Sequence, residues 1–153
     1  MSRVHRLVVL GVLFGIITLF ASSMIHGAEV ALQAQEYDQH RDVYKFGQGV
    51  DFGVLILIIV HAILAGIAIV WFYHITYDRL PLRRAAKGLS FAALFVVVAD
   101  FPTWLSNYTT FNIPDLLAFS GTLAAVVSTF VAGIILGILY ELLIRKPLET
   151  EEI

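Results

Sequence analysis

The hydrophobic and polar positions along the chain fall into four long apolar stretches separated by shorter polar connections. The stretches cover approximately residues 6–27, 50–76, 88–107 and 116–144. Each is long enough, at about 1.5 Å per helical residue, to cross roughly 30 Å of hydrocarbon. The pattern predicts a single all-α domain over residues 1–153, a polytopic membrane protein with four transmembrane helices in an up-down bundle.

Composition supports a membrane protein and narrows its chemistry. Of the 153 residues, 59% are hydrophobic and 14% are charged, whereas soluble domains are roughly 45–50% apolar and about 25% charged. The net charge of −2 disfavours a nucleic-acid partner, because such proteins need a concentrated basic surface. The chain has no cysteine, so any metal or haem iron must take histidine, methionine or oxygen ligands.

The distribution of basic residues predicts the orientation. Basic side chains gather in the amino terminus, the second connection and the carboxyl terminus: Arg3, Arg6, Arg79, Arg83, Arg84, Lys87, Arg145 and Lys146. By the positive-inside rule, both termini are expected on the cytoplasmic side of a bacterial inner membrane, with residues 28–49 forming an outer segment. The run from Leu7 to Ile25 exceeds the apolar core of about 7–15 residues in a signal peptide, so we expect a retained helix.

Small and polar residues recur along the first and fourth stretches. They are Gly11, Gly15, Thr18, Ser22 and His26 in the first, and Gly121, Ala125, Thr129, Gly133 and Gly137, continued by Glu141, in the fourth. Small side chains at this spacing let helix backbones approach closely in a bilayer. The stripes predict close packing, either within the chain or against a partner chain.

Two histidines lie in the second stretch, "IIVHAILAGIAIVWFYHITYDR". His61 and His74 are thirteen residues apart, which on a straight helix places them about 140° apart, on different faces. His74 belongs to an aromatic belt and is predicted to be an interfacial residue. His61 is expected near mid-membrane, where an ionisable side chain is usually paired or functional.

Asp100 is a candidate partner for His61. It lies in "FVVVADFPTWLSNY", two residues before Pro102, at a depth within about a turn of His61 in an antiparallel neighbour. The predicted pair could be structural, could act in a proton relay or ion pathway, or could belong to a cofactor pocket.

The segment "IVHAILAG" followed by "YDRLPLRRAAKGLSFAALFVVV" resembles the membrane-anchor subunits of succinate dehydrogenase and fumarate reductase. This resemblance implies that His61 ligates a haem b, and that Tyr77 and Asp78 lie near a quinone. Residues 88–107 and 116–144 contain no histidine, and His26 in the first stretch is expected about 10 Å nearer the outer surface than His61. A second haem ligand would therefore come from another membrane subunit.

The outer segment offers a possible metal site. His26 and Glu29 are three residues apart, and Glu36 and His40 are four apart. On a helix each pair shares one face, a geometry that suits zinc, copper or iron. The alternative is a solvated or subunit-facing surface.

The chain lacks the signatures of a free-standing enzyme, such as a phosphate-binding glycine loop, HExxH or a nucleophile elbow. We therefore do not expect a free-standing enzyme, and the resemblance to the membrane anchors implies an integral membrane subunit of a larger electron-transfer complex, respiratory or photosynthetic in type. It would anchor or line that complex and contribute to a b-type haem or quinone site. Two alternatives stay open: a small proton- or ion-coupled transport or channel subunit using His61 and Asp100, and a structural accessory subunit that supports complex assembly without a cofactor.

Overall fold

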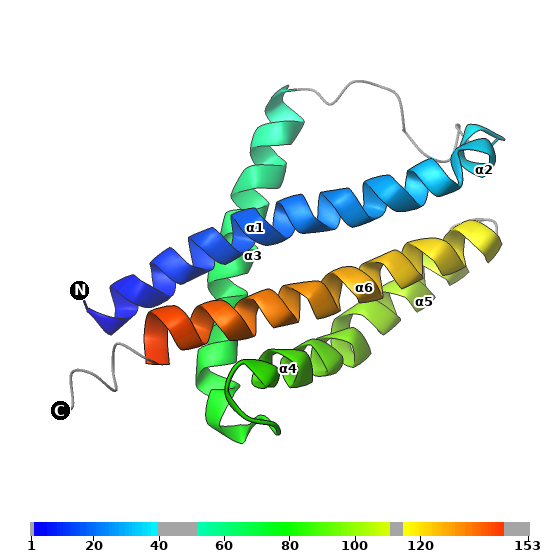
Figure 1. The fold of residues 1–153 in the computed structure, drawn as a ribbon. Coiled ribbons are helices and arrows are strands. Elements are labelled where there is room, and N and C mark those ends of the chain that lie inside the picture. The colour runs from blue at the N-terminus through cyan, green and yellow to red at the C-terminus, as the bar shows by residue number, and fades with distance from the viewer. Residues whose placement is uncertain (1, 40–51, 111–114, 146–153) are drawn as a thin grey trace.

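The structure is a computed structural model that describes residues 2–39, 52–110 and 115–145, and every regular element in these ranges is helical (Figure 1). Within these ranges four segments are long and apolar enough to cross a membrane, which confirms the predicted number of membrane-length helices. They are Arg3–Leu32, Phe52–Arg79, Arg84–Thr103 and Asp115–Arg145.

Six α-helices make up most of these segments. They are α1 (Arg3–Leu32), α2 (Ala34–Gln39), α3 (Phe52–Thr76), α4 (Lys87–Phe95), α5 (Phe101–Thr110) and α6 (Asp115–Tyr140). Short 3₁₀ turns, Tyr77–Arg79 and Arg84–Ala86, lie on either side of the connection between α3 and α4. Two π-helical turns complete the spans: η3 (Val96–Asp100) joins α4 to α5, and η4 (Glu141–Arg145) extends α6.

The helices form a layer with one crossing member. Figure 1 shows α1, α6 and the α4–α5 segment side by side and alternating in direction, with the start of α1 and the end of α6 at the same end. Helix α3 crosses them at a steep angle (Figure 1). The arrangement therefore differs from a regular up-down bundle, because α3 does not run alongside its neighbours over its whole length.

The steep crossing of α3 over α1 depends on glycine. A Cβ added to Gly11 would lie 2.6 Å from the Cα of Ile67, and one added to Gly15 or Gly66 would meet the backbone of the opposite helix. The two backbones are thus in direct contact, as small residues allow in membranes. The stripe predicted in the first stretch is confirmed as an intrachain contact at Gly11 and Gly15.

A second glycine crossing joins α4 to α6. A Cβ added to Gly133 would lie 2.5 Å from the carbonyl oxygen of Gly88, and one added to Gly137 would meet the backbone of Ala85. The predicted stripe of the fourth stretch therefore packs at these two glycines. Gly121, at its other end, has no atom within 4 Å of an added Cβ.

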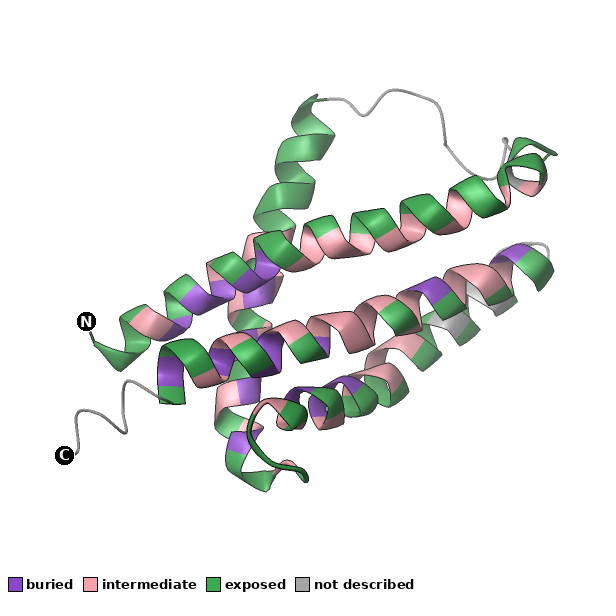
Figure 2. Cartoon of the chain, viewed as in Figure 1, coloured by how far each residue is buried: buried purple, intermediate pink, exposed green. Residues whose placement is uncertain are grey.

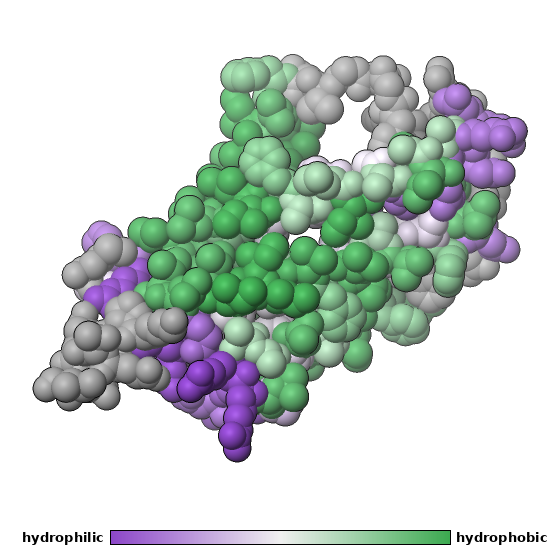
Figure 3. Space-filling view, viewed as in Figure 1, coloured by the Kyte–Doolittle hydropathy of each residue, from purple (hydrophilic) through white to green (hydrophobic). Residues whose placement is uncertain are grey.

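Burial is concentrated near the end where α1 begins and α6 finishes (Figure 2). Residues 52–60 of α3 are all exposed, and this half of the helix stands clear of the others (Figure 2). In the space-filling view, hydrophobic residues cover the middle of the visible face and hydrophilic residues gather at its ends (Figure 3). This is the surface expected of a protein whose middle contacts lipid.

Candidate functional site

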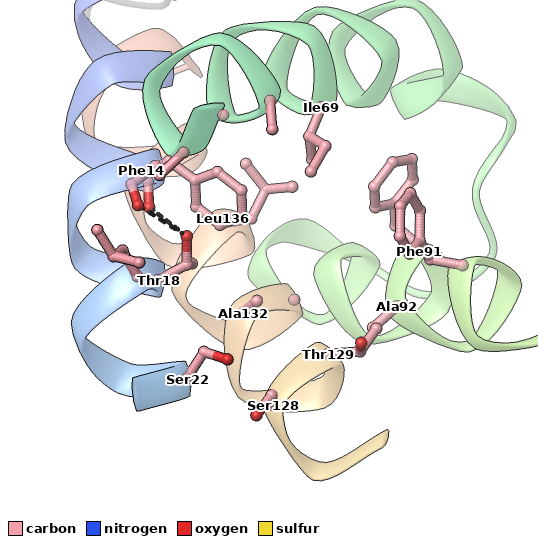
Figure 4. A pocket seen from close by; sticks show the side chains of 17 residues that line it. Phe14, Thr18, Ser22, Ile69, Phe91, Ala92, Ser128, Thr129, Ala132 and Leu136 are labelled. Carbon is pink, nitrogen blue, oxygen red and sulfur yellow. Dashed lines mark hydrogen bonds between the residues drawn. The ribbon is translucent and has the colours of Figure 1, made fainter. Parts of the chain in front are cut away.

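A cavity of about 300 Å³ lies where α1, α3, α4 and α6 meet (Figure 4). It sits between the two glycine crossings and is lined by residues of both. Its walls are mainly apolar, with the rings of Phe14 and Phe91 among them. The polar groups of its lining side chains are the hydroxyls of Thr18, Ser22, Ser128 and Thr129.

The hydroxyl groups of the cavity differ in where their protons go. Thr18 Oγ1 donates to the carbonyl oxygen of Phe14 at 2.7 Å, the bond drawn in Figure 4. Thr129 Oγ1 donates to Asp100 Oδ2 at 2.6 Å. Ser128 Oγ is buried and has no hydrogen-bond partner among the described residues. The lining of the cavity is therefore mainly apolar but carries distinct hydrogen-bond donor and acceptor groups.

The turn η3 places Asp100 against α6. In this turn the N–H of Phe101 bonds to the carbonyl of Val96, five residues earlier, and Pro102 has no N–H to continue the α-helical pattern. The extra residue in the turn changes the direction in which the following side chains point. The Asp100 carboxylate, half-buried, consequently reaches Thr129 from outside the cavity wall.

The predicted pair of His61 and Asp100 does not form. His61 is exposed on α3 and makes no hydrogen bond or ion pair with any residue that the structure describes, while Asp100 is bound to Thr129. The prediction matched the two residues by depth, which assumes that their helices run alongside one another. The steep crossing of α3 and the π-helical turn at Asp100 both break that assumption (Figure 1).

A second group of side chains, the tyrosine cluster, consists of Tyr73, His74, Tyr77, Tyr140 and Glu141. The ring of Tyr73 contacts those of Tyr77 and Tyr140 at centroid distances of 5.6 and 5.1 Å, and Tyr77 stacks on Tyr140 at 4.8 Å. His74 Nδ1 is hydrogen-bonded to Tyr140 Oη at 2.5 Å, and Tyr77 Oη donates to Glu141 Oε1. His74, predicted as an interfacial residue, thus helps to join α3 to α6.

The tyrosine cluster adjoins the cavity through Phe91, which lines the cavity and lies 5.2 Å from the ring of Tyr73. The ammonium group of Lys87 also contacts the tyrosine cluster. Lys87 Nζ donates to the backbone carbonyl of Tyr77 at 2.6 Å and lies over the Tyr77 ring, 4.0 Å from its centroid. Tyr77 is buried here, whereas Asp78 is exposed. Neither member of the Tyr77 and Asp78 pair lines the cavity itself.

The candidate metal ligands of the outer segment are spread along the chain. Glu29 Oε1 accepts a hydrogen bond from Ser120 Oγ at 2.7 Å, which links α1 to α6. His26 lies on α1 and Glu36 on α2, while His40 falls outside the described residues. Over residues 2–39, 52–110 and 115–145, no three histidine or acidic side chains are grouped as metal ligands.

Sequence reasoning did not single out the hydroxyls of Ser128 and Thr129 or the role of Tyr140 as functional features. Thr129 was included only in a stripe of small packing residues. The available signals were the polar pair Ser128 and Thr129 within an apolar helix and the Tyr140-Glu141 pair at its end. No family model, curated protein or solved structure matches this chain.

Proposed function

We propose that the protein is an integral membrane subunit of a larger electron-transfer complex, of the respiratory or photosynthetic type, and that its cavity holds the ring of a quinone. The observation that carries this proposal is the cavity of about 300 Å³ lined by residues of all four spans. Ligand pockets of roughly this size or larger are typically apolar with a few convergent polar groups.

The chemistry of the lining suits a quinone ring. Such a ring is flat and apolar, and its carbonyl oxygens accept hydrogen bonds. Phe14 and Phe91 supply aromatic surface, which favours stacked or edge-on contact with a ring. The buried hydroxyl of Ser128 has its proton available, because a serine hydroxyl carries one donor besides its two acceptor lone pairs.

A b-type haem would take a different place. The described residues that line the cavity include no histidine, whereas His61 is exposed on α3. A haem ligated by His61 would therefore lie between α3 and a partner subunit that supplies the second axial ligand. A visible spectrum of the purified complex, with and without His61→Ala, tests this arrangement, since a b-type band that persists unchanged in the variant excludes His61 as a ligand.

The subunit role is supported by the free half of α3. Residues 52–60 are exposed all round the helix and are mostly apolar, so they offer a surface for lipid and for neighbouring membrane subunits. The proposed orientation places both termini, and the connection carrying Arg79, Arg83 and Arg84, on the cytoplasmic side of a bacterial inner membrane.

Direct binding tests the quinone site. We expect a short-tailed quinone to bind the purified protein in detergent micelles, measured by isothermal titration calorimetry. Ala132→Leu fills the cavity and should weaken binding at least tenfold, because Ala132 lines it. Ala93→Leu, exposed on α4 and outside the cavity lining, is the matched control and should bind as the unaltered protein does. Absence of binding to the unaltered protein would overturn the proposal.

One observation favours a second candidate, a proton- or ion-coupled transport subunit. Asp100 lies within a span and is hydrogen-bonded to a residue of the cavity wall, and intramembrane carboxylates often mark ion or proton pathways. This candidate predicts proton or ion flux in liposomes containing the chain alone, abolished by Asp100→Asn. Absence of flux from the unaltered chain would reject the transport candidate. The remaining alternative, a structural accessory subunit, predicts that the larger complex assembles less stably when this chain is deleted.

A further inference from the structure

We infer that the cavity recognises its ligand through a hydroxyl group that donates to Thr129, so that it favours a ring carrying O–H over the same ring carrying only acceptors. This inference rests on the proposed function, because it names the ligand form that the same cavity selects. For a quinone-type ligand the preferred form is the reduced one, which carries hydroxyls in place of carbonyls.

The first step is the count of available protons in the cavity wall. A threonine or serine hydroxyl has one proton to donate and two lone pairs that accept. The proton of Thr129 is committed to Asp100, and that of Thr18 to the carbonyl of Phe14. Both oxygens therefore offer only lone pairs to a further partner.

The second step is the contrast with the neighbouring residue. Ser128 also lines the cavity, but its buried oxygen has no hydrogen-bond partner in the described part of the chain. Consecutive residues Ser128 and Thr129 thus present one donor-and-acceptor group beside one acceptor-only group. A ligand hydroxyl is both donor and acceptor and can bond to both of these residues, whereas a carbonyl or ether oxygen can bond only to Ser128 of this pair.

The third step concerns Asp100, which acts as a positioning residue because it reaches the ligand only through Thr129. In their hydrogen bond Thr129 donates and the Asp100 oxygen accepts, and a threonine hydroxyl has only one proton to give. The carboxylate therefore holds the Thr129 proton away from the cavity. In Asp100→Asn the amide can donate instead, which frees the Thr129 proton to turn toward the ligand.

A phenol and its methyl ether test the inference, because they differ only in the methyl group that replaces the hydroxyl proton. The probes are 2-naphthol and 2-methoxynaphthalene, titrated calorimetrically into the full-length protein in detergent micelles. The readout is the affinity of the protein for the phenol divided by its affinity for the ether. Comparing this ratio between variants in the same micelles cancels the different partitioning of the two probes into detergent. We expect Thr129→Val to lower the ratio that favours the phenol by about tenfold, the effect of one buried hydrogen bond.

Three further variants make the result specific. Thr122→Val is the matched control, since Thr122 lies on the same helix, donates to the carbonyl of Ala118 and does not line the cavity; it should keep the ratio unchanged. Thr129→Ser retains the hydroxyl and should preserve the ratio, even if Thr129→Val folds poorly. Asp100→Asn should lower the ratio while Thr129 is still present.

The outcomes separate the two proposals. If neither probe nor the short-tailed quinone binds the unaltered protein, the proposed function fails and the inference fails with it. If they bind but Thr129→Val leaves the ratio unchanged, or weakens both probes equally, the inference is overturned while the cavity remains a ligand site. An unchanged ratio in Asp100→Asn would remove Asp100 from the explanation and contradict its positioning role.

Discussion

Gly133→Ala is expected to destabilise the protein through a single added methyl group. Gly133 lies at the crossing of α4 and α6, where an added Cβ would be 2.5 Å from the Gly88 carbonyl oxygen and 2.6 Å from the Cβ of Ala92. An ordinary van der Waals contact is 3.4–4 Å. The obstructing oxygen belongs to the backbone, so no side-chain rotation can make room and the helices must separate.

The magnitude follows from two opposing terms. Alanine is favoured over glycine in a helix by about 1 kcal/mol. Overpacking a close contact costs typically about 1–3 kcal/mol, and a separation of even 0.5–1 Å forfeits roughly a quarter to a half of each dispersion contact across the gap. Gly121→Ala isolates the second term, because it shares the helix and the propensity gain but has nothing within 4 Å of its new Cβ.

The assay is equilibrium unfolding in mixed detergent micelles, followed by circular dichroism as the denaturing detergent is increased. We expect Gly121→Ala to be neutral or stabilising by up to about 1 kcal/mol, and Gly133→Ala to lie about 1–3 kcal/mol below it. On α1, Gly11→Ala and Gly27→Ala form a second pair of the same design, since only Gly11 has a close neighbour. Equal stabilities within either pair would refute the backbone contact inferred at that crossing.

Three other variants test the remaining polar groups. Tyr77→Phe leaves the Glu141 carboxylate without its hydroxyl donor and should lower the free energy of unfolding by about 1–3 kcal/mol. Tyr73→Phe removes a buried hydroxyl that has no described partner and should be neutral or stabilising. The opposite order of the two stabilities would contradict the hydrogen bonding described for the tyrosine cluster. His61→Ala should change the free energy of unfolding of the isolated chain by no more than about 0.5 kcal/mol, because His61 is exposed and makes no described hydrogen bond. A larger loss in the same unfolding assay would show that His61 has an intrachain partner.

Sequence alone predicted the features that depend on composition and periodicity. The four spans follow from apolar length, which is a property of each segment by itself. The close contacts at Gly11 and Gly133 follow from the recurrence of small residues on one helix face. In each case the signal lies within one helix and does not require knowing where the next helix runs.

The partner of Asp100 and the path of α3 could not be obtained in this way. Counting residues gives the position of a side chain along its helix but not the direction in which it points once a turn contains an extra residue, as η3 does before Asp100. A glycine contact brings two backbones together but does not fix their crossing angle, so the exposed position of His61 on α3 was not foreseeable. Both errors are errors of direction rather than of depth.

Each π-helical turn of the described spans carries a carboxylate that bonds to a hydroxyl of another segment: Asp100 in η3 binds Thr129, and Glu141 in η4 binds Tyr77. A hydroxyl partner differs from the histidine that depth alone suggested for Asp100. A histidine partner would leave the Thr129 proton free, whereas Thr129 as the partner commits that proton to Asp100. Asp100 can then keep the Thr129 proton turned away from the cavity, and the wall beside Ser128 stays an acceptor. The partner that the structure shows is therefore the one that gives the cavity a preference for a hydroxyl.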